Sequence, residues 1–117
     1  MAKRGKLMRV GFSAAQTEQM VGEAGSLALA GSSASDAAKI TAELTLLASG
    51  TGGAILPASD KGDTYLIKNE SGSTATLYPP TGATINTAAS LSMATAKSVI
   101  VFFTSPTACH TIPTVAS

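Results

Sequence analysis

The chain has 117 residues, enough for one domain, and only 13% of them are charged, about half the share that is usual in soluble proteins. Its net charge is +1, so overall electrostatics select neither an acidic nor a basic partner. A single cysteine excludes a disulfide within the chain, and no apolar run reaches the roughly 18 residues of a membrane span.

The composition is rich in small side chains, with two Tyr, three Phe and no Trp. At roughly 25 cal/mol per Å² of buried apolar surface, Ala and Thr contribute much less to stability than Leu or Phe. A lone domain of this composition would be marginally stable. We therefore expect contacts with copies of itself or with other chains to add the missing burial.

The N-terminal part, residues 1–34, is predicted to be an extended arm and a flexible connector. Four cations lie in its first ten residues, and the expected capsid or partner contacts are Lys3, Arg4, Lys6, Arg9 and Phe12. Three interpretations of the charge run stay open: a solvated arm, an arm that binds an acidic protein surface, or nucleic-acid contact. Nucleic acid is the weakest of the three, because no aromatic side chains interleave with the basic ones. Polar residues from Gln16 onward interrupt the apolar stretch of a signal peptide, so synthesis in the host cytoplasm is expected.

Residues 35–117 are predicted to form one β domain. Ile40, Ala42, Leu44 and Leu46 alternate with polar residues, which predicts a strand that buries these four side chains. The segment 69–73 contains Asn and Gly between two apolar runs, which predicts a hairpin. Turn signals recur about every eight to twelve residues, as in sandwiches and barrels. The expected fold is all-β: a small antiparallel β-sandwich, jelly-roll-like, with an extended N-terminal arm.

The run 98–104 is apolar on both of its faces. Such a run predicts either a central strand covered on both sides or a strand at a subunit interface. Ile100 and Phe102 are accordingly expected in the core or at the interface between subunits.

A search for chemistry finds no catalytic or metal-binding constellation in the sequence. Cys109 and His110 are adjacent, but neighbours in a strand point to opposite faces, and the further ligands of a zinc site are missing. The glycines of 49–53 lack the Lys-Ser/Thr of a phosphate-binding loop, so they are interpreted as turn residues. Asn69-Glu70-Ser71 matches a glycosylation acceptor, but the hairpin interpretation is preferred. Neither enzymatic activity nor a cofactor is expected.

One resemblance goes beyond these patterns. Residues 35–86 contain Gly-Gly-Ala-Ile-Leu-Pro, then a strand into Asn-x-x-Gly, then Leu-Tyr-Pro-Pro-Thr-Gly-Ala-Thr-Ile-Asn, and a later apolar strand contains Phe102-Phe103. This pattern resembles the head decoration or cement-type structural proteins of tailed bacteriophages. The chain departs from the pattern near its end, where Cys109-His110 replace the Trp on which such chains often close.

The resemblance implies a sandwich-like domain that assembles, as a homotrimer, on the major capsid protein at the capsid exterior and stabilises the shell. The alternative is another virion component, a fibre, spike or head–tail connector, built on a similar β module. A different class, a carbohydrate-binding or hydrolytic module, requires a groove with aromatics and paired carboxylates. Tyr65 and Tyr78 alone equip the chain poorly for that.

Overall fold

The computed structural model describes residues 24–114, and all regular structure in that range is β-strand. β-branched and aromatic runs separated by Gly, Pro, Asn and Asp favour this outcome. Within the described range no helix is present that has the length and hydropathy to cross a bilayer. The strands are β1 (Ala24–Leu29), β2 (Ala38–Lys39), β3 (Leu44–Gly50), β4 (Gly52–Ile55), β5 (Thr64–Asn69), β6 (Ala75–Tyr78), β7 (Thr84–Ile85), β8 (Leu91–Met93), β9 (Ser98–Ser105) and β10 (Ala108–Pro113).

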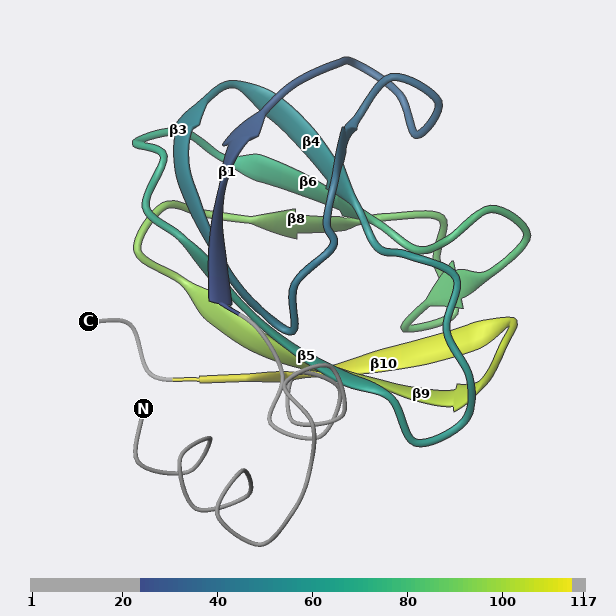
Figure 1. Cartoon of the computed structure of the whole chain (residues 1–117). Helices are drawn as coiled ribbons and strands as arrows, with labels where there is room; N and C mark the ends of the chain where they lie inside the picture. Colours follow the sequence, from purple (N-terminus) through teal and green to yellow (C-terminus); the bar gives the residue numbers. More distant parts are fainter. Residues whose placement is uncertain (1–23, 115–117) are drawn as a thin grey trace, which may run out of the picture.

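The first six strands wind between two sheets, so that each turn of the chain adds one strand to each sheet (Figure 1). β1, β3 and β5 belong to a six-stranded sheet, and β2, β4 and β6 belong to a four-stranded sheet. Within each sheet these strands run parallel, as in a β-solenoid. β1, β3 and β5 begin at the regularly spaced positions 24, 44 and 64, although the sequence carries no convincing internal repeat.

The last strands complete both sheets with antiparallel partners. The larger sheet has the order β1-β3-β5-β9-β10-β7 and the smaller one β2-β4-β6-β8. β9 runs antiparallel to β5 and β10, and β8 runs antiparallel to β6, whereas the other pairings are parallel. The all-β prediction is confirmed, but the predicted antiparallel, jelly-roll-like pairing is wrong for the parallel strands. A chain that crosses to the opposite sheet after each strand returns in its original direction, which produces parallel neighbours.

The predicted hairpin at 69–73 does not form, because β5 and β6 lie in different sheets. Asn69 is buried, and its Nδ2 donates to the carbonyl oxygens of Ser73 at 2.8 Å and of Met93 at 2.9 Å. Its Oδ1 accepts from the backbone N–H of Ser71 at 3.1 Å. The asparagine therefore fastens the corner after β5 to β8 of the other sheet. It does not supply the positive φ of a hairpin turn.

The strand predicted around residues 40–46 changes phase in its middle. Ile40 and Ala42 are buried as expected. A bend at residues 42–43 follows, and β3 begins directly after it in the opposite phase. A shift of one residue reverses every side chain of a strand, so the second half of the prediction is wrong.

The residues of β3 show the consequence of this shift. Thr45 and Leu47 point into the core, and the Thr45 hydroxyl donates to the carbonyl oxygen of Ala42 at 3.0 Å, which satisfies it. Leu44 and Leu46, predicted to be buried, face outward and are 47% and 38% exposed.

The two sheets share one apolar core between them. Tyr65 and Phe103 meet edge to face there, with 6.0 Å between ring centroids, and the Tyr65 hydroxyl hydrogen-bonds that of Ser59 at 2.6 Å. The core cluster consists of Leu29, Ile40, Leu47, Ala54, Leu56, Tyr65, Ile67, Ala75, Leu77, Ile85, Met93, Val99, Val101, Phe103 and Cys109.

A glycine corner connects β3 to β4. Gly50 and Gly52 have φ values of 85° and 115°, and a Cβ on Gly52 would lie 2.3 Å from the carbonyl oxygen of Gly31. Only glycine fits this close approach of two backbones. Gly50 and Gly52 have the positive φ of turn residues, as interpreted, but Gly50 ends β3, and Gly52 and Gly53 begin β4.

β1 belongs to the larger sheet, although it lies within the predicted arm and connector, residues 1–34. It pairs with β3 along its whole length, and Leu29 is buried. The predicted boundary between residues 34 and 35 therefore does not coincide with the edge of the sheet. Residues 1–23 lie outside the described range.

Candidate interaction surface

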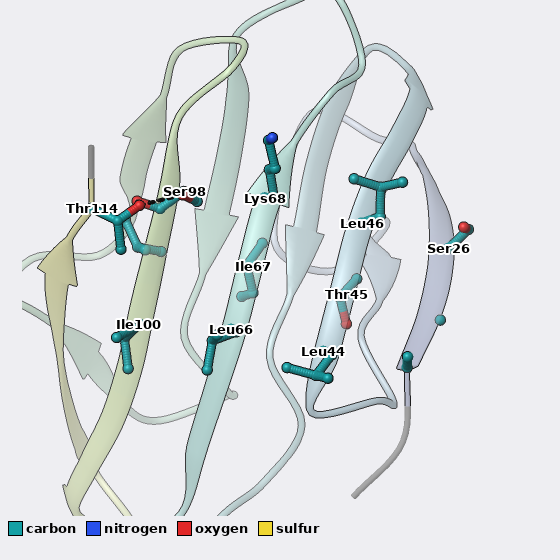
Figure 2. Close-up of a pocket in the computed structure, with 13 residues that line it drawn as sticks. Ser26, Leu44, Thr45, Leu46, Leu66, Ile67, Lys68, Ser98, Ile100 and Thr114 are labelled. Carbon is teal, nitrogen blue, oxygen red and sulfur yellow. Dashed lines mark hydrogen bonds between the residues drawn. The ribbon is translucent and has the colours of Figure 1, made fainter. Parts of the chain in front are cut away.

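Five strands of the larger sheet place an apolar residue at the same level on its outer face. Residues that pair directly in a sheet point to the same side, so these side chains form a continuous line across the strands. We call this line the transverse row. From β1 to β10 its members, each in register with the next, are Ala24, Leu44, Leu66, Ile100 and Ile112. Figure 2 shows the middle of the row, with Leu44, Leu66 and Ile100 side by side.

The large side chains of the transverse row are unusually exposed. Leu44 and Leu66 are each 47% exposed and Ile112 is 52% exposed, while Ile100 is half-buried. Most of the row borders a shallow hollow of about 690 Å³ on the outer face. Single exposed leucines are common, but a contiguous line of them marks a surface that gains free energy when it is covered.

A second row, of mixed polarity, lies beside the transverse row (Figure 2). Its members, each in register with the next, are Ser26, Leu46, Lys68 and Ser98. Its charge is balanced locally, because Lys68 Nζ lies 3.0 Å from Glu70 Oε1. The hydroxyls of Ser98 and Thr114 hydrogen-bond each other at its far end. The outer face therefore combines an apolar line with small polar groups, a mixture that is typical of protein–protein interfaces.

Ile100 and Phe102, the residues predicted for the core or the subunit interface, both lie on the outer face of β9. The residues that alternate with them are buried between the sheets, so the strand is apolar on both faces, as predicted. Phe102 packs against the ring of His110 on β10, with 5.7 Å between ring centroids. Both predicted residues are half-buried, and their part in a subunit interface remains a prediction.

The structure does not place the other predicted contacts. Lys3, Arg4, Lys6, Arg9 and Phe12 lie outside the described residues, so their role as partner contacts also remains a prediction. The described chain begins at Ala24, at one end of the transverse row.

Cys109 and His110 point to opposite sides of β10, as predicted for neighbours in a strand. Cys109 is fully buried, and its Sγ lies 3.4 Å from the carbonyl oxygen of Thr84. Burial raises the pKa of the Cys109 thiol from 9.0 to about 11. The thiol therefore stays protonated at neutral pH, which is the opposite of an activated nucleophile or metal ligand.

Two aspartates of the described range, Asp36 and Asp63, accept hydrogen bonds from nearby backbone N–H groups. Asp63 Oδ2 accepts from the Asp60 N–H at 2.9 Å, which confirms these residues as turn formers. Asp36 Oδ1 accepts from the Ser33 N–H at 2.9 Å and from the Ser33 hydroxyl, and these hydrogen bonds lower the pKa of Asp36. Between residues 24 and 114 no three His, Cys, Asp or Glu side chains gather as a metal site.

The tyrosines that a sugar-binding site would use are occupied elsewhere. Tyr65 lies in the core, and the ring of Tyr78 lies so close to Gly53 that a Cβ there would be 2.6 Å from its Cε2. Neither ring is presented as a platform for stacking a sugar. Asn69, in the glycosylation acceptor sequence, is buried in the folded chain.

Comparison with known proteins adds no relative: no protein-family model matches the chain, and neither the curated proteins nor the solved structures contain a significant match. The functional argument therefore depends on the outer face and on the sequence pattern.

The transverse row was missed by sequence reasoning. Leu44 was assigned to the core from the alternation that precedes it, and Ala24 was assigned to a connector. Only the register of β1, β3, β5, β9 and β10 brings its members together. The available signal was the exposed phase of β5, where Leu66 alternates with the core residues Tyr65 and Ile67.

Proposed function

We propose that this chain is a non-enzymatic virion structural protein that decorates and stabilises the assembled capsid of a tailed bacteriophage. It binds the exterior of the shell, clamping major capsid protein subunits as a homotrimer. The observation that carries the proposal is the outer face of the larger sheet, an exposed apolar surface on a unit with few charges. The resemblance of residues 35–86 to decoration and cement-type proteins supports the capsid as the partner.

The architecture is compatible with this role. The fold is all-β, with two sheets around one core, and this is compatible with the sandwich-like module that the resemblance implies. A protein that binds only the assembled shell stabilises it by mass action. Many identical copies make a modest gain at each site add up over the particle.

The alternative proposal is a fibre, spike or head–tail connector component. The observation that favours it is the parallel winding of the first six strands, since stacked coils of this kind build elongated assemblies. The two proposals differ in copy number: a shell offers on the order of hundreds of equivalent sites, whereas a fibre or connector offers on the order of tens at most.

The test is to purify phage particles from the strain that encodes the chain, count its copies by quantitative mass spectrometry and locate its density by electron cryo-microscopy. Hundreds of copies on the outer surface of the head are expected. Tens of copies at the tail or the head vertex would replace the proposal by its alternative. A protein that is expressed in the cell but missing from purified particles would overturn both.

A further inference from the structure

We propose that the transverse row is the docking site of the chain's own N-terminal segment, residues 1–23. The inference concerns the free chain before it binds a shell and does not depend on the proposed function. In the free chain the segment covers the outer face, and the face becomes available to a capsid when the segment is released. The inference goes beyond that function because it assigns an intramolecular partner to a surface that the described residues leave exposed.

The N-terminal segment is attached at one end of the transverse row. Ala24, the first member of the row, is also the residue to which the segment is joined. Gly22 lies two residues before Ala24. A reversal of the chain over the sheet would cost little conformational free energy there, because glycine readily adopts positive φ values.

The N-terminal segment is long enough to cross the transverse row. From β1 to β10 the row crosses four steps between strands of about 4.8 Å each, roughly 19 Å in all. Twenty-three residues span about 35 Å as a helix and about 75 Å when extended. The segment is therefore long enough to cross the whole row in either conformation and still project beyond it.

The side chains of the segment match the apolar character of the row. The segment carries apolar side chains that match an aliphatic surface: Leu7, Met8, Val10, Phe12, Met20 and Val21. Met20 and Val21 are the nearest to the junction, within four residues of Ala24. The basic side chains lie further away, in the first ten residues, where they stay available to another partner.

A second copy of the chain is the competing occupant of the row. A tethered segment has an effective concentration in the millimolar range for a short linker, far above the usual concentration of the free protein. The tethered occupant therefore covers the row first, unless the interface between copies is much stronger. We therefore assign the row to the segment and not to a second copy.

Photocrosslinking tests the proposal directly. The full-length chain is made with a benzophenone amino acid in place of Leu66, and unlabelled chains are mixed with ¹⁵N-labelled chains before irradiation. Crosslinked peptides that join position 66 to residues 1–23 of the same isotope are expected. Their yield should exceed, by about tenfold, the yield from the same probe at Ser92, an exposed residue on β8 of the smaller sheet.

Three outcomes would overturn the proposal. Peptides of mixed isotope that join position 66 to strands of another chain would make the row an interface between copies. Mixed-isotope peptides from residues 1–23 would mean that the segment is exchanged between chains. A yield no higher than that of the Ser92 probe would mean that the row is open to solvent.

A milder substitution provides an independent measurement. Leu66→Ser removes an aliphatic side chain from the middle of the row at a position exposed enough to leave the core intact. Trypsin cleavage after Arg9 should become about fivefold to tenfold faster in this variant, because the segment is released more often. Ser92→Ala serves as the control and should leave the rate unchanged. Equal rates in Leu66→Ser and the unmodified protein would contradict the docking.

Discussion

Asn69 is the polar residue on which the corner between the two sheets depends. Its side-chain amide donates to the carbonyl oxygens of Ser73 and Met93 inside the protein. Asn69→Ala leaves both carbonyls without these donors, so we expect the free energy of unfolding to fall by about 2–4 kcal/mol. Urea unfolding followed by circular dichroism measures this. The control is Thr74→Ala, at an exposed position of the same corner, which should cost about 0.5 kcal/mol or less. Equal losses in the two variants would contradict the special position of Asn69.

Cys109 gives the stability a specific dependence on alkaline pH. Because burial raises the pKa of its thiol from 9.0 to about 11, the folded chain keeps a proton that the unfolded chain releases. The contribution is full below the unfolded pKa and is lost as the pH rises through the folded pKa. The free energy of unfolding should therefore fall more steeply between pH 9 and 11 in the unmodified protein than in Cys109→Ala.

Urea unfolding at a series of pH values checks this prediction. The two proteins differ only at position 109, so the difference between the two profiles isolates the thiol. Parallel profiles would mean that the thiol releases its proton equally in the folded and unfolded chains.

At the scale of the strand, β3 offers a matched pair of adjacent leucines. Leu47 is fully buried, whereas Leu46 is 38% exposed on the outer face. Leu47→Ala should lower the free energy of unfolding by about 2–5 kcal/mol through lost burial and a cavity. Leu46→Ala should cost about 1 kcal/mol or less, because its side chain already contacts water. Chemical unfolding of both variants measures the contrast, and a larger loss for Leu46 would restore the phase that the sequence pattern predicted.

β9 offers a second pair, which tests the interface predicted at Phe102. Phe103→Asp places a charge in the core and should unfold the chain. Phe102→Asp lies on the outer face beside His110 and should leave the circular dichroism spectrum unchanged. If Phe102 contributes to a trimer, sedimentation velocity should show the variant shifted towards monomer. A folded variant with an unchanged sedimentation profile would remove Phe102 from the interface.

These elements also explain how far the sequence could be read. The strand-forming runs were recognisable, because β propensity and turn residues are local properties, and the opposite orientations of Cys109 and His110 follow from the period of a strand. The pairing of strands was not, because a loop that returns within one sheet and a loop that crosses to the other use the same Gly and Asn residues. Nothing local to Asn69 indicated that its amide would reach β8.

The sequence pattern predicts the wrong phase for β3 for a similar reason. The alternation from Ile40 to Leu46 is unbroken in the sequence, whereas the folded chain bends at residues 42–43, and Ile40 and Leu47 are both buried in the same core. The transverse row depends on this phase and on the register of five strands. A surface that is assembled across a sheet is therefore the kind of site that single-sequence patterns do not show.

For the whole molecule, charge is distributed unevenly along the chain. The described domain has few charges and an apolar outer face, whereas four cations gather within the first ten residues. A basic segment that extends beyond a folded unit increases the rate and specificity of binding to an acidic surface more than it increases the stability of the fold. This distribution leads to a prediction about truncation.

Deleting residues 1–12 should leave the β domain folded and weaken its binding to capsids. Within residues 24–114 the core cluster begins at Leu29, so the circular dichroism spectrum and the midpoint of urea unfolding should change little. The loss of four cations should reduce affinity for phage heads stripped of the protein by about tenfold or more, measured by co-sedimentation at low ionic strength. Replacing Lys61, an exposed cation in a turn of the β domain, with Ser is the control and should bind normally. The difference between the truncated and full-length chains should shrink as salt is added, because screening weakens contacts between exposed charges. A truncated chain that unfolds in solution would mean that the segment belongs to the core, and a difference in affinity that persists in high salt would assign the binding to its apolar residues.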